Sequence, residues 1–217
     1  MPESDPRQQA ERHAKEADKP VVVLIVGIPG AGKTVLIDRA ASSSQWTVLD
    51  LDRFRRRLPA SLRRLPIPYP LFVLAMICAI ALRPHVVAES RGTYAWLRRL
   101  VTACARIRRR EAAIVLLDAP HEDAVAGQER RGRVAPATIM DRYTADWSRL
   151  LDAARSGVLA AEGWDEVVVL DRAQASSVDD LGELLRDPSA VERSTGADPA
   201  ADAPSSAGLA GEQPSSR

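Results

Sequence analysis

The segment VVVLIVGIPGAGKT, residues 21–34, decides the fold of this chain. Six apolar residues lead into a turn that contains three glycines, and a lysine and a threonine follow the turn. Gly27, Gly32, Lys33 and Thr34 occupy every fixed position of the pattern G-x-x-x-x-G-K-[ST]. An apolar run before this pattern and a helical run after it predict a strand, a phosphate-binding loop and a helix.

Lysine is rare in this chain, and its position in the loop is informative. The chain has 30 Lys and Arg residues in all, and Lys33 is the last lysine. A compact ammonium on a thin stem can reach between the β- and γ-phosphates, a slot that a planar guanidinium does not fit. The Thr34 hydroxyl is the expected Mg²⁺ ligand. The pattern therefore predicts ATP and Mg²⁺ as cofactors, with the nucleotide bound by Gly27, Ile28, Pro29, Gly30, Ala31, Gly32, Lys33, Thr34 and Val35.

Short apolar runs alternate with helical patterns along the rest of the chain. The runs are continuously apolar, which is typical of strands that are covered on both faces. Such an alternation predicts an α/β fold, a P-loop NTPase three-layer αβα sandwich with a five-stranded parallel sheet. We expect strands at 21–26, 46–50, 85–88, 113–117 and 166–170, and helices at 33–43, 53–65 with a break at Pro59, 71–82, 92–109, 121–130, 136–155 and 177–186.

Composition divides the chain into three parts. Residues 1–19 are polar and predict a flexible N-terminal arm, residues 20–187 predict a single P-loop kinase-like domain, and residues 188–217, rich in Pro, Ala, Ser and Gly, predict a disordered tail. The first twenty residues lack an apolar leader, so we expect a cytoplasmic protein. A net charge of +1 does not by itself indicate nucleic acid or a membrane, and we expect no membrane partner. The sequence leaves the oligomeric state open.

An uninterrupted apolar segment, LFVLAMICAIAL at residues 71–82, needs a separate interpretation. As a helix it is about 18 Å long, which is short of the roughly 30 Å of hydrocarbon in a bilayer. We expect a core helix that is buried nearly all round, and the alternative is a surface that faces a partner or touches a membrane. Cys78 and Cys104 are expected to be buried, inert thiols.

Three acids follow predicted strands and should meet at the carboxyl edge of the sheet, where ligands of open parallel sheets bind. Asp50 and Asp52 follow the second strand, and Glu89 follows the third. Asp52 is either a general base for an acceptor or the cap of the next helix, or both. Glu89 is expected at the metal, with Asp50 as the alternative there, or is an ordinary strand-end carboxylate. Arg55 lies one helical turn after Asp52, and with Arg56 it is expected to bind the acceptor.

The segment GQERRGRVAP, residues 127–136, gathers arginines around a glycine. A basic segment after the fourth strand can fold over a phosphoryl group, neutralise its charge and exclude water. We expect Arg131 and Arg133 to contact the nucleotide in this way. The alternative is a solvated surface loop.

Taken together, the stretches GIPGAGKT, LDRFR, VVAES and LLDAPHEDAVAGQERRGRVAP resemble the polynucleotide-kinase-like branch of P-loop kinases. This branch includes zeta toxins, chloramphenicol phosphotransferase and small kinases described as AAA domain proteins, and the resemblance covers roughly residues 20–155. It implies that Asp52 is the base for the acceptor hydroxyl and that Arg55 binds the acceptor's phosphate. It also implies Glu89 as the acid after the third strand and Arg131 as the lid arginine.

These features favour an ATP-dependent phosphotransferase that acts on a hydroxyl group of a small molecule or of a nucleic-acid 5′ end, although nucleic acid is not the favoured acceptor. Lys33, Asp52 and Arg131 are the expected catalytic residues. The alternative is a regulatory NTPase that hydrolyses ATP without a dedicated acceptor. The chain has no NKxD motif, which disfavours a GTPase.

Overall fold

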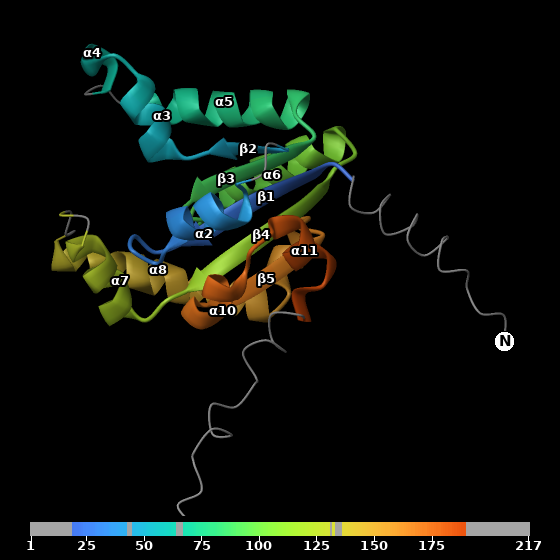
Figure 1. Ribbon diagram of the computed structural model, residues 1–217. Coiled ribbons are helices and arrows are strands. Elements are labelled where there is room, and N and C mark those ends of the chain that lie inside the picture. The colour runs from blue at the N-terminus through green and yellow to red at the C-terminus, as the bar shows by residue number, and fades with distance from the viewer. Residues whose placement is uncertain (1–18, 43–44, 64–66, 131, 133–135, 190–217) are drawn as a thin grey trace, which may run out of the picture.

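The computed structural model describes residues 19–42, 45–63, 67–130, 132 and 136–189 (Figure 1). Within these residues five strands form one sheet in the order β2-β3-β1-β4-β5, and every neighbouring pair is parallel. Helices cover both faces of the sheet, as Figure 1 shows. The α/β sandwich that the sequence predicts is therefore confirmed. The strands are β1 (Val21–Gly27), β2 (Trp46–Leu49), β3 (His85–Ser90), β4 (Glu111–Asp118) and β5 (Glu166–Asp171).

The central strand β1 has the most buried sequence in the chain. Its residues from Val22 to Val26 are at most 1% exposed. Val21 pairs with His85 of β3 on one side and with Glu111 of β4 on the other. This register aligns the carboxyl ends of the three central strands, so that Gly27, Ser90 and Asp118 lie at one edge of the sheet.

The helices follow the predicted intervals, with differences at their ends that have local causes. The predicted helix 33–43 ends at residue 40. The predicted helix 177–186 begins only at residue 181, where Asp180 caps it, and a separate short helix that was not predicted, capped by Asp171, precedes it at residues 172–177. The helices are α2 (Lys33–Ala40), α3 (Leu51–Arg57), α4 (Ala60–Arg63), α5 (Pro68–Leu82), α6 (Ala95–Ile107), α7 (His121–Glu129), α8 (Ala137–Arg155), α9 (Val158–Ala161), α10 (Arg172–Ser177) and α11 (Leu181–Arg186).

Helix α5 is the apolar segment, and the expectation that it is buried nearly all round is wrong. Phe72, Met76 and Ile80 pack into the protein on one face. The opposite face is open to solvent because α5 is a surface helix with its covered side toward α3, α6 and β3. Leu74 is 55% exposed, and Cys78 lies on the same face, so the expectation of a buried thiol at Cys78 is also wrong. Cys104 is half-buried, and burial raises the pKa of its thiol.

None of the described helices combines the length and the apolar character that crossing a bilayer requires. The predicted N-terminal arm and C-terminal tail fall almost entirely on residues 1–18 and 190–217, which lie outside the described residues.

A buried ion pair ties α6 to the segment that precedes β5. The Arg98 guanidinium donates two hydrogen bonds of 2.8 Å to the Glu162 carboxylate and a third to the carbonyl of Gly92. The two side chains are 9% and 7% exposed. Because both charges are removed from water, each relies on its attraction to the other to offset the free-energy cost of losing its hydration.

We expect Arg98→Met to lower the free energy of unfolding by about 3–5 kcal/mol, because it leaves the Glu162 carboxylate buried without its partner. Urea denaturation would measure the loss. Arg149→Met is the matched control, because Arg149 is 77% exposed and its ion pair with Asp146 should contribute less than about 1 kcal/mol. An equal effect of the two substitutions would contradict the expectation.

Candidate active site

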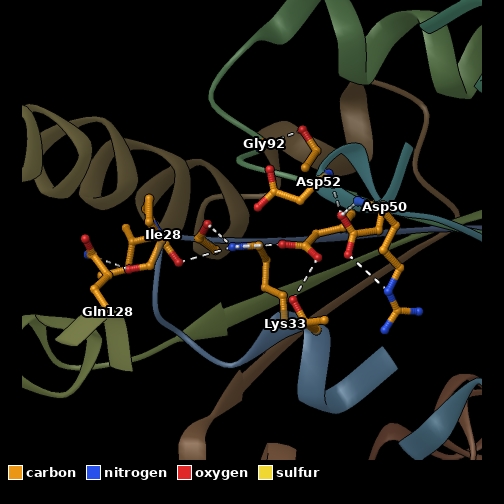
Figure 2. Close-up of polar contacts among 12 residues, drawn as sticks. Ile28, Lys33, Asp50, Asp52, Gly92 and Gln128 are labelled. Atoms are coloured by element: carbon orange, nitrogen blue, oxygen red, sulfur yellow. Dashed lines mark hydrogen bonds and ion pairs between the residues drawn. The ribbon is translucent and has the colours of Figure 1, made fainter. Parts of the chain in front are cut away.

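The loop between β1 and α2 closes around the ammonium group of its own lysine. Lys33 is only 7% exposed, and its Nζ donates hydrogen bonds to the carbonyl oxygens of Gly27, at 2.9 Å, and Ile28, at 3.2 Å. Figure 2 shows the ammonium group between these carbonyls and the acids at the end of the neighbouring strands. Lys33 also lines the large cavity at this edge of the sheet. The ammonium therefore lies inside the concavity of the loop, as the sequence pattern predicts.

Glu89, at the end of β3, is the acid that contacts the loop directly. Its Oε1 lies 3.6 Å from Lys33 Nζ, and its Oε2 accepts a hydrogen bond of 3.2 Å from the Thr34 hydroxyl. Burial raises the pKa of the Glu89 carboxyl, and the Lys33 charge offsets part of that rise. The negative charges of Asp50 and Asp52 raise the pKa further. Glu89 and Thr34 thus bring two hard oxygen ligands together beside the loop, a donor set that suits Mg²⁺.

Asp50 and Asp52 have different surroundings, although they are two residues apart. Asp50 is 8% exposed and caps α3, accepting hydrogen bonds from the amides of Asp52, at 2.7 Å, and Arg53, at 3.2 Å. The interpretation of Asp52 as the cap of this helix is therefore wrong, because the helix begins at Leu51. Asp52 lies in the first turn of α3 and lines the same cavity as Lys33.

The cavity has a volume of about 1460 Å³ and joins the phosphate loop to the arginines of α3. A smaller cavity of about 280 Å³ adjoins it and is lined by Asp52, Arg55, Arg56 and Arg63. Asp52 and Arg56 line both cavities. The three expected acceptor-binding residues, Asp52, Arg55 and Arg56, are therefore brought together. Further side chains to which the sequence assigned no role in binding also line the large cavity, namely Ser90, Arg91, Gln128, Ile139 and Tyr143, together with Arg53 and Arg57 of the basic run around the expected acceptor site.

One of the α3 arginines, Arg53, forms ion pairs with neighbouring acids at the surface. The Arg53 guanidinium contacts Asp38 of α2, and its Nε lies 3.6 Å from Asp50. The contact with Asp38 raises the pKa of Arg53. By contrast, Arg56, Arg57 and Arg63 are exposed and pair with no carboxylate among the described residues. Positive charge at the two cavities is thus left over for a ligand.

Helix α7 rests on the phosphate loop through two glycines. A Cβ at Gly30 would lie 2.0 Å from the carbonyl oxygen of Ala124, and a Cβ at Gly127 would lie 2.5 Å from the carbonyl oxygen of Gly30. Neither contact leaves room for a side chain. The buried Gln128 amide donates a 3.0 Å hydrogen bond to the carbonyl of Pro29 and lies 3.0 Å from the Met140 sulfur. This helix therefore supports the loop from behind, an arrangement that no motif in the sequence indicates.

On the far side of the cavity, Arg91 and Tyr143 lie together. The Arg91 guanidinium lies 4.6 Å from the centre of the Tyr143 ring and donates a hydrogen bond to its hydroxyl. This pair joins the end of β3 to α8. The expected lid residues Arg131 and Arg133 lie outside the described residues, so their role stays a prediction.

Comparison with protein families identifies the family to which the chain belongs. The model of the AAA domain family matches residues 22–155, which include the phosphate loop, the three acids and helices α2 to α8. The chain belongs to the AAA domain family. The match confirms the resemblance that the sequence motifs indicated. Among curated proteins, none matches the chain.

Two solved structures show a similar fold. A chain of the PezAT chromosomal toxin–antitoxin system of Streptococcus pneumoniae superposes with a TM-score of 0.56 at 14% identity, covering 86% of this chain and 87% of that one. A gluconokinase from Sinorhizobium meliloti 1021 gives a TM-score of 0.52 at 17% identity, covering 81% and 93%. At such low identity the likeness shows the fold alone, which is that of P-loop kinases.

Glu89→Gln tests the electrostatics of the site in metal-free and nucleotide-free buffer. Because the native pKa of Glu89 is raised, protonation of this group stabilises the native state fully below the unfolded pKa of about 4.3, and that stability is lost as the pH rises through the native pKa. At neutral pH, which lies above the unfolded pKa, the wild type has lost at least part of this stability. We therefore expect Glu89→Gln to increase the free energy of unfolding at neutral pH, with the difference disappearing in acid.

Urea denaturation across this pH range would measure the effect, with Glu122→Gln on the exposed start of α7 as the control. If Glu89→Gln were less stable than the wild type at neutral pH, the contacts of the Glu89 carboxylate with Lys33 and Thr34 would contribute more to stability than burial of its charge costs.

Gly127→Ala tests the support of the loop by α7. The added methyl group would meet the Gly30 carbonyl at 2.5 Å, so the helix and the loop must separate. We expect a loss of about 1–3 kcal/mol in the free energy of unfolding, the usual cost of overpacking, together with weaker binding of Mg-ATP in calorimetry. Glu122→Ala on the same helix should leave both unchanged. Wild-type nucleotide affinity in Gly127→Ala would show that the loop does not depend on this contact.

Proposed function

We propose that the protein is an ATP-dependent phosphotransferase that moves the γ-phosphoryl group of ATP to a hydroxyl group. The observation that carries this proposal is the placement of Lys33 and Asp52 on one continuous cavity, with exposed arginines beyond Asp52 that pair with no carboxylate in the described part of the chain. A phosphate site on one side and an acid with cations on the other provide places for a donor and an acceptor. The AAA domain family and its P-loop kinase fold support the same conclusion.

On the donor side, the loop amides and the Lys33 ammonium would hold the nucleotide's phosphates. The carbonyls of Gly27 and Ile28 now accept hydrogen bonds from Lys33, and phosphate oxygens can take their place at the same ammonium. Thr34 and Glu89 would hold Mg²⁺, which neutralises charge on the phosphate oxygens when it is bound. The described residues contain no group of three or more His, Cys, Asp or Glu side chains that could hold a metal. The remaining ligands would therefore be phosphate oxygens and water.

On the acceptor side, Asp52 would accept the proton of the attacking hydroxyl group. The acceptor oxygen forms a bond to the γ-phosphorus while the bond from that phosphorus to the β,γ-bridging oxygen breaks. The proton passes to the Asp52 carboxylate, and ADP leaves with the electron pair. Arg55 and Arg56, which line the smaller cavity beside Asp52, would hold an anionic or polar part of the acceptor. We also propose that Arg131 and Arg133 close over the transferring group, with ATP preferred to GTP and a cytoplasmic site of action.

The test is an acceptor screen with ATP labelled at the γ-phosphate, in which nucleosides, sugars, antibiotics and 5′-hydroxyl oligonucleotides are offered in parallel. Label transfer to one class would identify the acceptor. We expect Asp52→Asn to lower transfer by roughly 10²–10⁴ while nucleotide affinity stays close to that of the wild type. Lys33→Ala should abolish both transfer and binding.

Asp146→Asn is the matched control, because it makes the same exchange on α8, away from both cavities, and should leave transfer unchanged. If the wild type hydrolyses ATP rapidly with no acceptor and Asp52→Asn does not slow it, the protein is an NTPase and the proposal is wrong. If Asp52→Asn loses nucleotide binding, Asp52 belongs to the metal site and not to the acceptor.

A further inference from the structure

The edge of the sheet opposite the nucleotide cavity carries a patch that combines arginines with exposed aliphatic side chains. We name it the basic corner and define it as Leu82, Arg83, Ile107, Arg108, Arg109 and Arg110. These residues end α5 and α6 and lead into β3 and β4. His85 and Glu111, which follow the two segments, both pair with Val21 and therefore lie two strand spacings apart, about 10 Å. The Arg110 guanidinium also donates a hydrogen bond to the carbonyl of Arg83.

The aliphatic side chains of the basic corner are unusually open. Leu82 is 78% exposed and Ile107 is 79% exposed, more than any other large hydrophobic residue in the part of the chain that the structure describes. Leu82 also ends a row of apolar side chains along α5 that includes Leu74 and Cys78. This helix carries no charged residue from Pro68 to Leu82. The corner therefore presents two aliphatic tips and an adjoining apolar helix face to the solvent.

Among the residues that the structure describes, no acidic side chain balances the charge of the basic corner. No carboxylate among the described residues pairs with any of its four arginines, and the neighbouring Glu111 pairs with Lys19. Burial and then the positive charge of Arg108 lower the pKa of Arg110. Cations at the end of α6 favour the helix dipole. That effect concerns only Arg108, Arg109 and Arg110, and it accounts neither for Arg83 nor for the exposed Leu82 and Ile107.

We propose that the basic corner docks the protein on a bilayer surface that contains anionic lipids. Arginines beside aliphatic side chains match the headgroup region and the acyl-chain region of one leaflet. The guanidinium groups would pair with lipid phosphates, while Leu82 and Ile107 would enter the boundary of the acyl chains. A nucleic-acid backbone would match the arginines and leave the aliphatic tips without a role. The contact is peripheral and needs no spanning helix. It departs from our expectation of no membrane partner, because the near-zero net charge of the chain conceals this local cluster.

This docking would leave the proposed enzyme accessible. The nucleotide cavity lies at the carboxyl ends of the strands, and the basic corner lies at their amino ends. A protein bound by the corner therefore keeps its cavity toward the solution. The inference does not depend on phosphotransfer, and the two can fail separately.

The experiment is co-sedimentation of the full-length protein with vesicles of phosphatidylcholine alone and with vesicles that also contain phosphatidylserine. We expect binding to the anionic vesicles only, weakened by added salt. Arg108→Gln with Arg109→Asn should weaken binding by about fivefold for each arginine removed. Leu82→Ser with Ile107→Ser should weaken it to a similar or greater extent.

Arg149→Gln and Val158→Ser provide matched controls, because Arg149 is exposed on α8 and Val158 is 50% exposed on α9. Neither should change vesicle binding, and circular dichroism would verify that every variant is folded. The proposal is overturned if the wild type does not bind anionic vesicles, or if it binds neutral vesicles equally well. It is also overturned if only the arginine substitutions matter, or if the corner binds duplex DNA in place of vesicles.

Discussion

The ammonium of Lys33 inside the phosphate loop is the interaction on which the rest of the site depends. A cation buried to this degree needs compensation from its surroundings, and it receives it from the carbonyls of Gly27 and Ile28 and from Glu89. Glu89 can reach it only because β3 lies next to β1 in the sheet. The strand order therefore determines which acid meets the lysine, and hence where a metal ion and a γ-phosphate would lie.

The second strand contributes two acids whose roles separate for a physical reason. Asp50 is nearly buried, and its carboxylate is used by the amides at the start of α3 and by Arg53. It fixes where the helix begins and thereby directs the next turn, with Asp52, toward the cavity. A structural acid thus positions the acid that we assign to the chemistry, which is why two similar residues at neighbouring positions are not interchangeable.

The sequence predicted the sheet, the loop and the gathering of Lys33, Thr34, Asp52 and Glu89, because apolar strands and a glycine-rich turn are local patterns. It did not predict the arrangement behind the loop. Gln128 looks like an ordinary helix residue until the fold brings it to the Pro29 carbonyl, and no spacing rule indicates that contact. The prediction that helix α5 is buried nearly all round failed for a related reason. Its composition indicates only that the helix is apolar, whereas the exposure of each side chain depends on how many neighbours the tertiary fold places around it.

The close approach of Gly30 and Gly127 has a mechanical consequence. Wherever two backbones touch with no side chain between them, no rotamer change can absorb a displacement. Any movement of the Gly30 peptide therefore requires the backbone of α7 to move as well. The two glycines thus couple the position of the loop directly to the position of α7.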